Sequence, residues 1–289
     1  MTGADERRSA VVVVGASQGI GRAMATVAAR DGGAIVLVAR SADALAEAAA
    51  GVGAAGGEAF VLELDLLADD ASDQLQAFLD ANGLYCDVLV NSAGLGLRGA
   101  ATLLPHDDQM GIVDLNVRAL TDLTLRFLPG MVSRGRGGVI NLGSIAGFTP
   151  GPNMALYYAS KSFVRSFSEA LHREVHRTGV TVTCVAPGPV STEFLQKSGA
   201  SRATLFRVLP RLKPDYVAER AWQGFRSGRR TVVPGAIAKL ASVVTALLPS
   251  AVLLPLIDRL QRRSSDLCPC GSGKPYVKCH GRGGFWSRS

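Results

Sequence analysis

The feature that most restricts the fold is the stretch VVVVGASQGIG, which covers residues 11–21. A run of β-branched residues without polar alternation is typical of a strand buried on both faces of a parallel sheet. The glycines that follow, Gly15, Gly19 and Gly21, let the chain turn sharply and bring its backbone close to a ligand. A helix that begins at such a turn offers free N–H groups and a positive dipole end to an anion. The stretch therefore predicts a dinucleotide-binding strand–turn–helix unit, with a plain strand-to-helix turn as the alternative.

Apolar runs alternate with helix-like segments along most of the chain. The runs are rich in β-branched residues and lie at 10–16, 34–40, 59–66, 87–94, 138–144, 180–188 and 229–235. Between them Ala and Leu recur at helical spacing, as in residues 21–32 and 42–53. This alternation predicts a Rossmann-type doubly wound parallel sheet in a three-layer α/β/α domain.

Two later segments depart from this alternation. Residues 191–230 mix polar and basic residues with Phe, Leu and Trp, and we expect a helical insertion near the carboxyl edge of the sheet, where substrates bind. Residues 236–263 are strongly apolar and contain Pro249 and Pro255, which predicts two short helices broken at the prolines.

The apolar segment 236–263 has several interpretations. None of its uninterrupted apolar runs reaches the length of a membrane-spanning helix. One interpretation is that it lies in a membrane interface, with Arg259, Arg262 and Arg263 beside anionic head groups. Alternatively, it packs on the main domain, covers a substrate pocket or forms a dimer face.

The residues that end the second apolar run bear on the cofactor. Folds that bind NAD place an acidic side chain here, where it accepts hydrogen bonds from the ribose. This chain has Ala39 and Arg40 instead. Because a guanidinium holds a 2′-phosphate through charge-assisted hydrogen bonds, Arg40 favours NADP(H). The alternative is that Arg40 is a solvated residue at the start of the next turn.

Tyr157 and Lys161 are the strongest candidates for catalysis. They are four residues apart, so they share a helix face and place a phenol beside an ammonium. A free tyrosine is only about one part in a thousand ionised at pH 7, and we expect the cation to lower the pKa of Tyr157. Such a pair suits a carbonyl–alcohol interconversion in which Ser144 hydrogen-bonds the same oxygen. Asn116 would support a contact between Lys161 and solvent.

Each of these residues also has an ordinary explanation. Tyr157 would line a pocket, Lys161 would be a solvated helix charge, and Ser144 would cap a helix. Their joint order, with thirteen residues from Ser144 to Tyr157 and four from Tyr157 to Lys161, favours a functional set instead.

Taken together, these motifs resemble those of the short-chain dehydrogenase/reductase family. The resemblance covers roughly residues 8–235 and is carried by GASQGIG, LDL with Asp65, NSAG at 91–94, Asn116, Ser144, Tyr157, Lys161 and PGPVST at 187–192. It implies an NADP-dependent dehydrogenase or reductase of class EC 1.1.1, and dimers or tetramers formed through helix faces. One difference is Ser92, where many members have a second asparagine.

The resemblance also implies which residues hold the cofactor. The expected set is Gly15, Ser17, Gly19, Ile20, Gly21, Arg40, Asp65, Leu66, Asn91, Ala93, Gly94, Tyr157, Lys161, Pro187, Gly188 and Thr192. Within it, Asp65 and Leu66 would lie by the adenine and Asn91 by the adenosine half. Pro187, Gly188 and Thr192 would hold the nicotinamide end.

Four residues would form the catalytic centre of such an enzyme. By resemblance, Tyr157 would donate or accept the proton, and Lys161 would bind the nicotinamide ribose. Ser144 would polarise the substrate oxygen, and Asn116 would complete a proton relay. Residues 213–235 and the apolar segment after them also resemble a subgroup with hydrophobic C-terminal extensions, which implies an apolar or lipid-like carbonyl substrate.

The end of the chain contains a cluster of soft metal ligands. The cluster consists of Cys268, Cys270, Cys279 and His280. Three thiols and an imidazole are the closed tetrahedral ligand set expected of a structural Zn²⁺ site. A segment this short has no core, so the metal would supply most of its folding free energy. Residues 266–281 resemble the SEC-C zinc motif of the bacterial preprotein translocase ATPase, which implies a protein-interaction module. The alternative is a redox-active or incidental cysteine cluster.

The net charge of +7 is concentrated at the same end. From Arg259 onward, seven Lys and Arg accompany one acid, Asp266, so this part carries six of the seven net charges. A basic tail attracts anionic lipid, nucleic acid or an acidic protein, or only keeps itself solvated. We expect no nucleic-acid partner, because no pattern of aromatic and basic residues accompanies the charge.

Cysteine usage and the first residues bear on the compartment. Cys86 and Cys184 lie in apolar strand-like runs and are expected to be inert core thiols. The remaining three cysteines are an odd set beside a histidine, which favours metal over disulfides in a reducing compartment. The polar start MTGADERRSA is unlike a secretory signal. We therefore expect a cytoplasmic protein, with peripheral membrane association as an option.

These observations predict three parts. Residues 1–235 would form the catalytic domain, 236–263 a helical extension and 264–289 a zinc-binding tail. The predicted function is an NADP(H)-dependent oxidoreductase. The alternative is an NADP(H)-sensing adaptor that acts through the zinc tail, although an adaptor has no need of a complete Ser–Tyr–Lys–Asn set.

Overall fold

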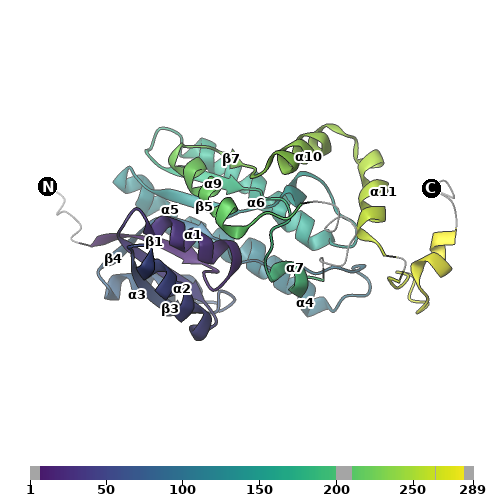
Figure 1. Cartoon of the computed structure of the whole chain (residues 1–289), viewed down its shortest axis with the longest axis horizontal. Helices are drawn as coiled ribbons and strands as arrows, with labels where there is room; N and C mark the ends of the chain where they lie inside the picture. Colours follow the sequence, from purple (N-terminus) through teal and green to yellow (C-terminus); the bar gives the residue numbers. More distant parts are fainter. Residues whose placement is uncertain (1–6, 200–209, 264, 283–289) are drawn as a thin grey trace.

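The centre of the molecule is a parallel sheet. The computed structural model describes residues 7–199, 210–263 and 265–282. Within them the sheet has seven strands in the order β3-β2-β1-β4-β5-β6-β7, and all neighbouring pairs are parallel (Figure 1). The strands are β1 (Arg8–Val14), β2 (Ala34–Ala39), β3 (Glu58–Glu63), β4 (Leu84–Asn91), β5 (Gly138–Leu142), β6 (Thr181–Val185) and β7 (Thr231–Val232). Each overlaps a predicted run, so the doubly wound fold is confirmed.

Helices cover both faces of this sheet. One face packs against α1 (Gly19–Ala29), α2 (Ala42–Ala54) and α9 (Pro214–Arg226), and the other against α3 (Ala71–Ala81), α5 (Leu120–Arg134) and α6 (Ala155–Glu174). Val13 of β1 belongs to the first core, whereas Val12 and Val14 belong to the second. Because successive strand residues point to opposite faces, a strand that feeds two cores is apolar throughout.

The strand order reverses between β1 and β4, and in doubly wound sheets ligands bind at the carboxyl ends of the strands there. Several short elements surround this edge. They are α4 (His106–Val113), the π-helical turn η1 (Asp114–Ala119), the 3-10 turn η2 (Ile145–Phe148) and α7 (Phe194–Lys197).

The segment expected as one helical insertion, 191–230, is divided in the structure. Residues 200–209 fall outside the described part, and α7 lies at the carboxyl edge as expected. Helix α9 does not: it packs against α1 and contributes Val217, Ala221 and Phe225 to the core. Its apolar positions recur at helical spacing, so it completes one outer layer of the sheet.

Two helices follow the sheet, as predicted, and they lie at the upper right of Figure 1. They are α10 (Ala236–Leu247) and α11 (Ser250–Gln261), and they break at Pro249. The break expected at Pro255 is absent, because this proline lies inside α11. Both Pro255 and Ala251, whose carbonyl loses its helical partner, are exposed, so water can solvate that carbonyl. No helix in the described residues is long and apolar enough to cross a bilayer.

Candidate active site and metal cluster

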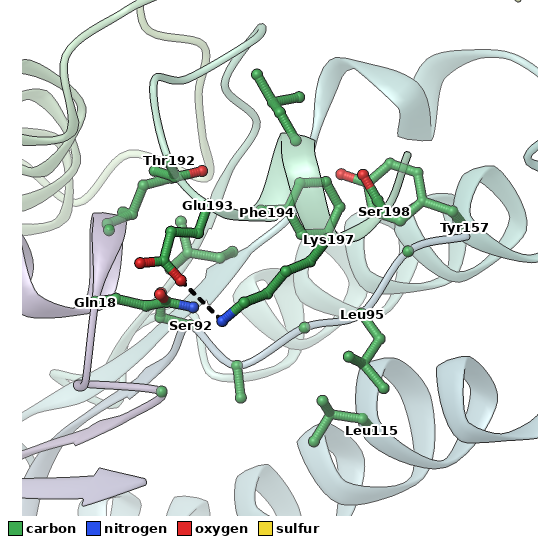
Figure 2. Close-up of a pocket in the computed structure, with 18 of the residues that line it drawn as sticks. Gln18, Ser92, Leu95, Leu115, Tyr157, Thr192, Glu193, Phe194, Lys197 and Ser198 are labelled. Carbon is green, nitrogen blue, oxygen red and sulfur yellow. Dashed lines mark ion pairs between the residues drawn. The ribbon is translucent and has the colours of Figure 1, made fainter. Parts of the chain in front are cut away.

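A cavity of about 990 Å³ opens at the carboxyl ends of the strands. In Figure 2, Leu95 and Leu115 lie on one side of it, and Phe194 and Lys197 of α7 extend over it. Most of the predicted site residues line this cavity: Gly15, Ser17, Gly19, Ile20, Arg40, Asp65, Leu66, Ala93, Gly94, Ser144, Tyr157, Lys161, Pro187, Gly188 and Thr192. The predicted residues that do not line it are Gly21, Asn91 and Asn116.

Close backbone packing explains the glycines of the first turn. Gly15 has φ +78°, and a Cβ atom there would lie 2.5 Å from the backbone nitrogen of Ala93. A Cβ atom at Gly21 would lie 2.1 Å from the backbone oxygen of Gly15. The turn after β1 therefore packs directly on the turn after β4. Gly21 brings the start of α1 against the turn after β1.

The start of α1 is left open to the cavity. Gln18, its N-cap residue, makes no side-chain cap, and the first turn of the helix contains no acidic residue. The backbone N–H groups and the positive dipole end of the helix are therefore available to an anion. This is the arrangement that a diphosphate requires.

Arg40 lies at the adenosine end of the predicted cofactor path. It is exposed, lines the cavity and makes no hydrogen bond or ion pair with the residues that the structure describes. Arg22, which also lines the cavity, is already engaged: it donates to the backbone oxygen of Ser17 and pairs with Glu47 at 3.1 Å. Of these two arginines, Arg40 is the one whose guanidinium is available to a 2′-phosphate.

Asn91 lies beneath the cavity rather than in its wall. Its Nδ2 atom donates to Oδ1 of Asn141 at 2.8 Å and to Oγ1 of Thr124 at 3.1 Å. Asn141 in turn donates to Ser168 at 3.0 Å. This buried network joins β4, β5, α5 and α6 and gives the Asn91 side chain a supporting place. The contact with adenosine that the resemblance implies stays a prediction.

Ser144, Tyr157 and Lys161 meet at one end of the cavity. Ser144 follows β5, whereas Tyr157 and Lys161 lie one turn apart on α6. The Nζ atom of Lys161 lies 5.9 Å from the ring centroid of Tyr157 and donates to the backbone oxygen of Leu142 at 2.7 Å. The structure thus brings together a phenol, a hydroxyl and an amine from two elements.

The pKa of Tyr157 moves opposite to the expected direction. Burial raises the pKa of Tyr157 to about 12, and a hydrogen bond with the Ser144 side chain opposes the rise only in part. Burial also lowers the pKa of Lys161 to about 8. The expectation that Lys161 would lower the pKa of Tyr157 below its ordinary value is wrong for this structure, because desolvation of the phenolate outweighs its neighbours.

Asn116 supports the centre from behind. It lies in the π-helical turn η1, and its side chain holds the backbone of Leu95 by two hydrogen bonds, of 2.8 and 2.9 Å. A third bond, of 3.0 Å, joins it to Ser160. Isolated π-helical turns are frequent at functional sites. This one fixes the segment after β4 against the helix that carries Tyr157.

Two aromatic neighbours of Tyr157 were absent from the predicted site. Phe194 of α7 packs against the Tyr157 ring at a centroid distance of 5.3 Å. Tyr158 lies edge-on to it at 6.2 Å, and its hydroxyl accepts a hydrogen bond of 2.7 Å from Gln261. The only sequence signal for Phe194 is its place in the segment 191–230, where Phe and Leu stand among polar residues. Nothing local pointed to Gln261, which is 103 residues from Tyr158.

The predicted metal ligands come together at the end of the chain. The four ligand atoms, from Cys268, Cys270, Cys279 and His280, all lie within 4.8 Å of one another. The Sγ atoms of Cys270 and Cys279 are 3.7 Å apart, and Sγ of Cys279 is 3.5 Å from Nδ1 of His280. Ligand atoms around a tetrahedral zinc ion are separated by roughly 3.5–3.8 Å. The donor set and these two distances therefore fit Zn²⁺, whereas Sγ of Cys268 lies closer to Nδ1 of His280, at 3.1 Å.

Comparison with known proteins agrees with this geometry. Residues 9–203 match the family model of the short chain dehydrogenase, and residues 265–282 match that of the SEC-C motif. The chain is 33% identical over 219 residues to the NADP-dependent 3-hydroxy acid dehydrogenase YdfG of Escherichia coli, covering 73% of this chain and 87% of that protein. It is 34% identical over 188 residues to the very-long-chain 3-oxoacyl-CoA reductase of Mus musculus, covering 63% of this chain and 60% of that protein.

A solved structure extends the comparison to the fold. The short-chain dehydrogenase from Sphingobium yanoikuyae in complex with NADPH superposes with a TM-score of 0.70 and is 28% identical, covering 82% of this chain and 93% of that one. The family model alone spans most of the sheet and the Ser–Tyr–Lys group. The chain therefore belongs to the short-chain dehydrogenase family and carries a C-terminal SEC-C motif.

Proposed function

We propose that this protein is an NADP(H)-dependent oxidoreductase that interconverts a carbonyl and an alcohol, with Tyr157 as the general acid and base. The observation that carries the proposal is one cavity lined by both the glycine-rich turn and the group Ser144, Tyr157 and Lys161. A helix N-terminus for a diphosphate and a proton donor for a carbonyl oxygen therefore face the same space.

The residues divide the chemistry as follows. When bound, the nicotinamide supplies or accepts the hydride. Tyr157 is protonated at neutral pH, because burial raises its pKa to about 12, so it donates its proton to the carbonyl oxygen during reduction. Ser144 hydrogen-bonds the same oxygen. Alcohol oxidation requires the proton to leave Tyr157, so that direction is favoured as pH rises.

Arg40 supports the choice of NADP(H) over NAD(H). Its guanidinium lines the cavity and has no partner among the described residues, so a 2′-phosphate would neutralise it. The Escherichia coli relative is described as NADP-dependent, and the Sphingobium structure contains NADPH. Both agree with an arginine at the end of β2.

The walls near Tyr157 favour an apolar or lipid-like substrate. Several leucine and phenylalanine side chains line the cavity: Leu95, Leu97, Leu115, Phe194 and Leu195. The mouse relative is described as acting on very-long-chain 3-oxoacyl-CoA, although this chain covers only 60% of it. A long apolar carbonyl compound would bury its tail against these residues.

The complete Ser–Tyr–Lys–Asn group favours an enzyme over an NADP(H)-sensing adaptor. Lys161 is buried, and its charge is penalised there. A protein that only senses a nucleotide gains nothing from that penalty, whereas a catalyst uses the cation beside Tyr157.

The C-terminal parts extend the proposal. Cys268, Cys270, Cys279 and His280 would hold a structural Zn²⁺ ion, and the tail around them would contact a protein partner. We keep the division into a catalytic domain at 1–235, a helical extension at 236–263 and a zinc tail at 264–289. A cytoplasmic location suits free thiols in this cluster.

Exposed apolar side chains suggest two further contacts. Ile237, Leu240, Val243, Val244 and Leu247 recur along one face of α10 and are all exposed. With the exposed Lys239 and Arg259 nearby in sequence, this face suits an anionic membrane surface. On α5 and α6 the exposed apolar residues are Leu125, Val132 and Phe163, which suit a homo-oligomer contact.

The experiment that tests the function follows NADPH oxidation with a panel of aldehydes and ketones, from short to long-chain, for the wild type and Tyr157→Phe. We expect turnover that the variant reduces by at least about 100-fold, with NADPH affinity retained. Tyr85→Phe, at a tyrosine of β4 that does not line the cavity, is the control for loss of a tyrosine hydroxyl. Turnover that survives in Tyr157→Phe would rule out the assigned acid–base residue. NADPH binding without turnover on any substrate would favour the sensing adaptor.

A further inference from the structure

The C-terminal extension is tied to the substrate end of the cavity by a small set of buried polar contacts. Gln261, the last residue of α11, is fully buried and donates from Nε2 to the Tyr158 hydroxyl at 2.7 Å. Tyr158 lines the cavity next to Tyr157. The position of a cavity-wall side chain therefore depends on a residue outside the region matched by the dehydrogenase family model, which ends at residue 203.

Arg98 makes the second tie. Its Nε and Nη2 atoms donate to the backbone oxygen of Gln261 at 3.0 and 2.6 Å. Its guanidinium also pairs with the carboxylate of Asp266. Only 8% of the Arg98 side chain is exposed. Leu97, just before Arg98, lines the cavity. Arg98 therefore joins the cavity wall to the end of α11 and to Asp266, two residues before Cys268.

The same wall has a third tie and a link to α7. Asn153, which precedes α6, donates to Asp258 of α11 at 2.8 Å, and its backbone oxygen accepts from Gly99. The backbone nitrogen of Arg98 donates to the oxygen of Ser198, just after α7. Arg98 and Asn153, from two different segments, thus contact Asp258, Gln261 and Asp266.

Asp266 connects these ties to the cysteine–histidine cluster. Its backbone oxygen accepts from Tyr276 at 2.8 Å, and Cys268, two residues later, is one of the four candidate ligands of the cluster. The Arg262 guanidinium lies 3.9 Å from the centroid of the Tyr276 ring, and Thr102 donates to the backbone oxygen of Pro269. A segment of this length without a core depends on its metal for a fixed conformation. Asp266 therefore joins Arg98 to the segment that carries the cluster.

We propose that Arg98, Gln261 and Asp266 form a clamp through which the metal-loaded cluster orders the substrate end of the cavity. The predicted effect of the clamp on turnover rests on the proposed function, whereas its effect on the order of the cavity wall does not. The three residues are positioning residues: they hold Tyr158 and the segment around Leu97 from behind and do not touch the reacting atoms. Loss of the clamp would weaken binding of the carbonyl compound and leave the cofactor end intact.

The first test needs no substrate. Hydrogen–deuterium exchange is measured on the full chain with zinc bound and after removal of zinc by a chelator, with metal content measured in parallel. We expect amides in residues 95–104 and 153–160 to exchange at least about tenfold faster without zinc, and those in 10–21 to be unchanged. Unchanged exchange at 95–104 would overturn the proposal. Asp266→Ala with zinc still bound should reproduce the faster exchange at 95–104.

The second test measures the effect on substrate binding. Gln261→Met removes the hydrogen bond to Tyr158 but keeps the side-chain volume, and Gln74→Met on the exposed face of α3 is the control. With dodecanal and NADPH, we expect KM for dodecanal to rise about tenfold in Gln261→Met, with kcat and NADPH affinity little changed.

A double-variant cycle separates a clamp from general damage. If the bond between Tyr158 and Gln261 carries the effect, Tyr158→Phe combined with Gln261→Met raises KM no further than the larger single change. An unchanged KM in Gln261→Met, or strictly additive effects, would overturn the role of Gln261. A wild-type protein without activity on dodecanal would count against the lipid-like substrate, and hydrogen exchange would still decide the clamp.

Discussion

Lys161 donates a hydrogen bond of 2.7 Å from Nζ to the backbone oxygen of Leu142, at the carboxyl end of β5. This contact holds a buried amine next to Tyr157 in a place where its charge is disfavoured, and burial lowers the pKa of Lys161 to about 8. The site therefore retains a group that weakens the fold, which is common where function and stability compete.

Replacing Lys161 with methionine should stabilise the protein at neutral pH while reducing activity. Below pH 8 the lysine is charged in both the folded and unfolded states, so the penalty on the folded state is complete. Between pH 8 and about 10 the folded lysine is neutral and the unfolded one is charged, so the wild type gains stability relative to the variant. In urea unfolding at pH 7, the free energy of unfolding of Lys161→Met should exceed that of the wild type by about 1–2 kcal/mol. The difference should shrink by pH 9.5. A gain that does not change with pH would contradict this account.

A substitution at Gly15 should separate steric contact from backbone strain. Gly15 and Gly32 both have φ +78°, but a Cβ atom at Gly15 meets the backbone of Ala93, whereas one at Gly32 meets nothing within 4 Å. Gly15→Ala should therefore cost at least about 2 kcal/mol more than Gly32→Ala and should also abolish NADPH binding. Equal losses of stability in urea unfolding would show that the contact with Ala93 is unimportant.

Replacing Arg40 with aspartate should change the cofactor preference. Arg40 is the cavity-lining arginine without a partner among the described residues, so its loss removes the positive charge available to a 2′-phosphate. Titration calorimetry should show NADPH affinity falling at least about tenfold, with NADH affinity unchanged or higher. Arg220→Asp on α9 serves as the control for charge. If the affinities for NADPH and NADH fall equally, Arg40 contacts a part that the two cofactors share.

The apolar face of α10 should bind anionic vesicles. Leu247 is 78% exposed, and we expect Leu247→Glu to reduce co-sedimentation with phosphatidylglycerol vesicles by at least about threefold. Val61→Glu, on the exposed side of β3, should leave binding unchanged. Binding that is equal on neutral phosphatidylcholine would remove the role assigned to Lys239 and Arg259.

Local patterns were sufficient for the fold class and for most of the site. The uninterrupted apolar runs around Val12 and Val36 required strands buried on both faces, and the glycines after Val14 required a tight turn into a helix. Tyr157 and Lys161 share a helix face through their spacing alone. The same holds for the metal ligands, because four soft donors within a few residues can meet without help from the rest of the chain.

Long-range packing settled the remainder. The side chain of Asn91 turns into a buried network with Asn141 and Thr124, which lie on other elements. The pKa of Tyr157 rises because burial, which depends on the whole fold, outweighs its local neighbours. Tyr158 and Gln261 are joined across 103 residues. Neither the extent of desolvation nor the pairing of distant polar groups follows from local periodicity, since both arise only when separate elements pack.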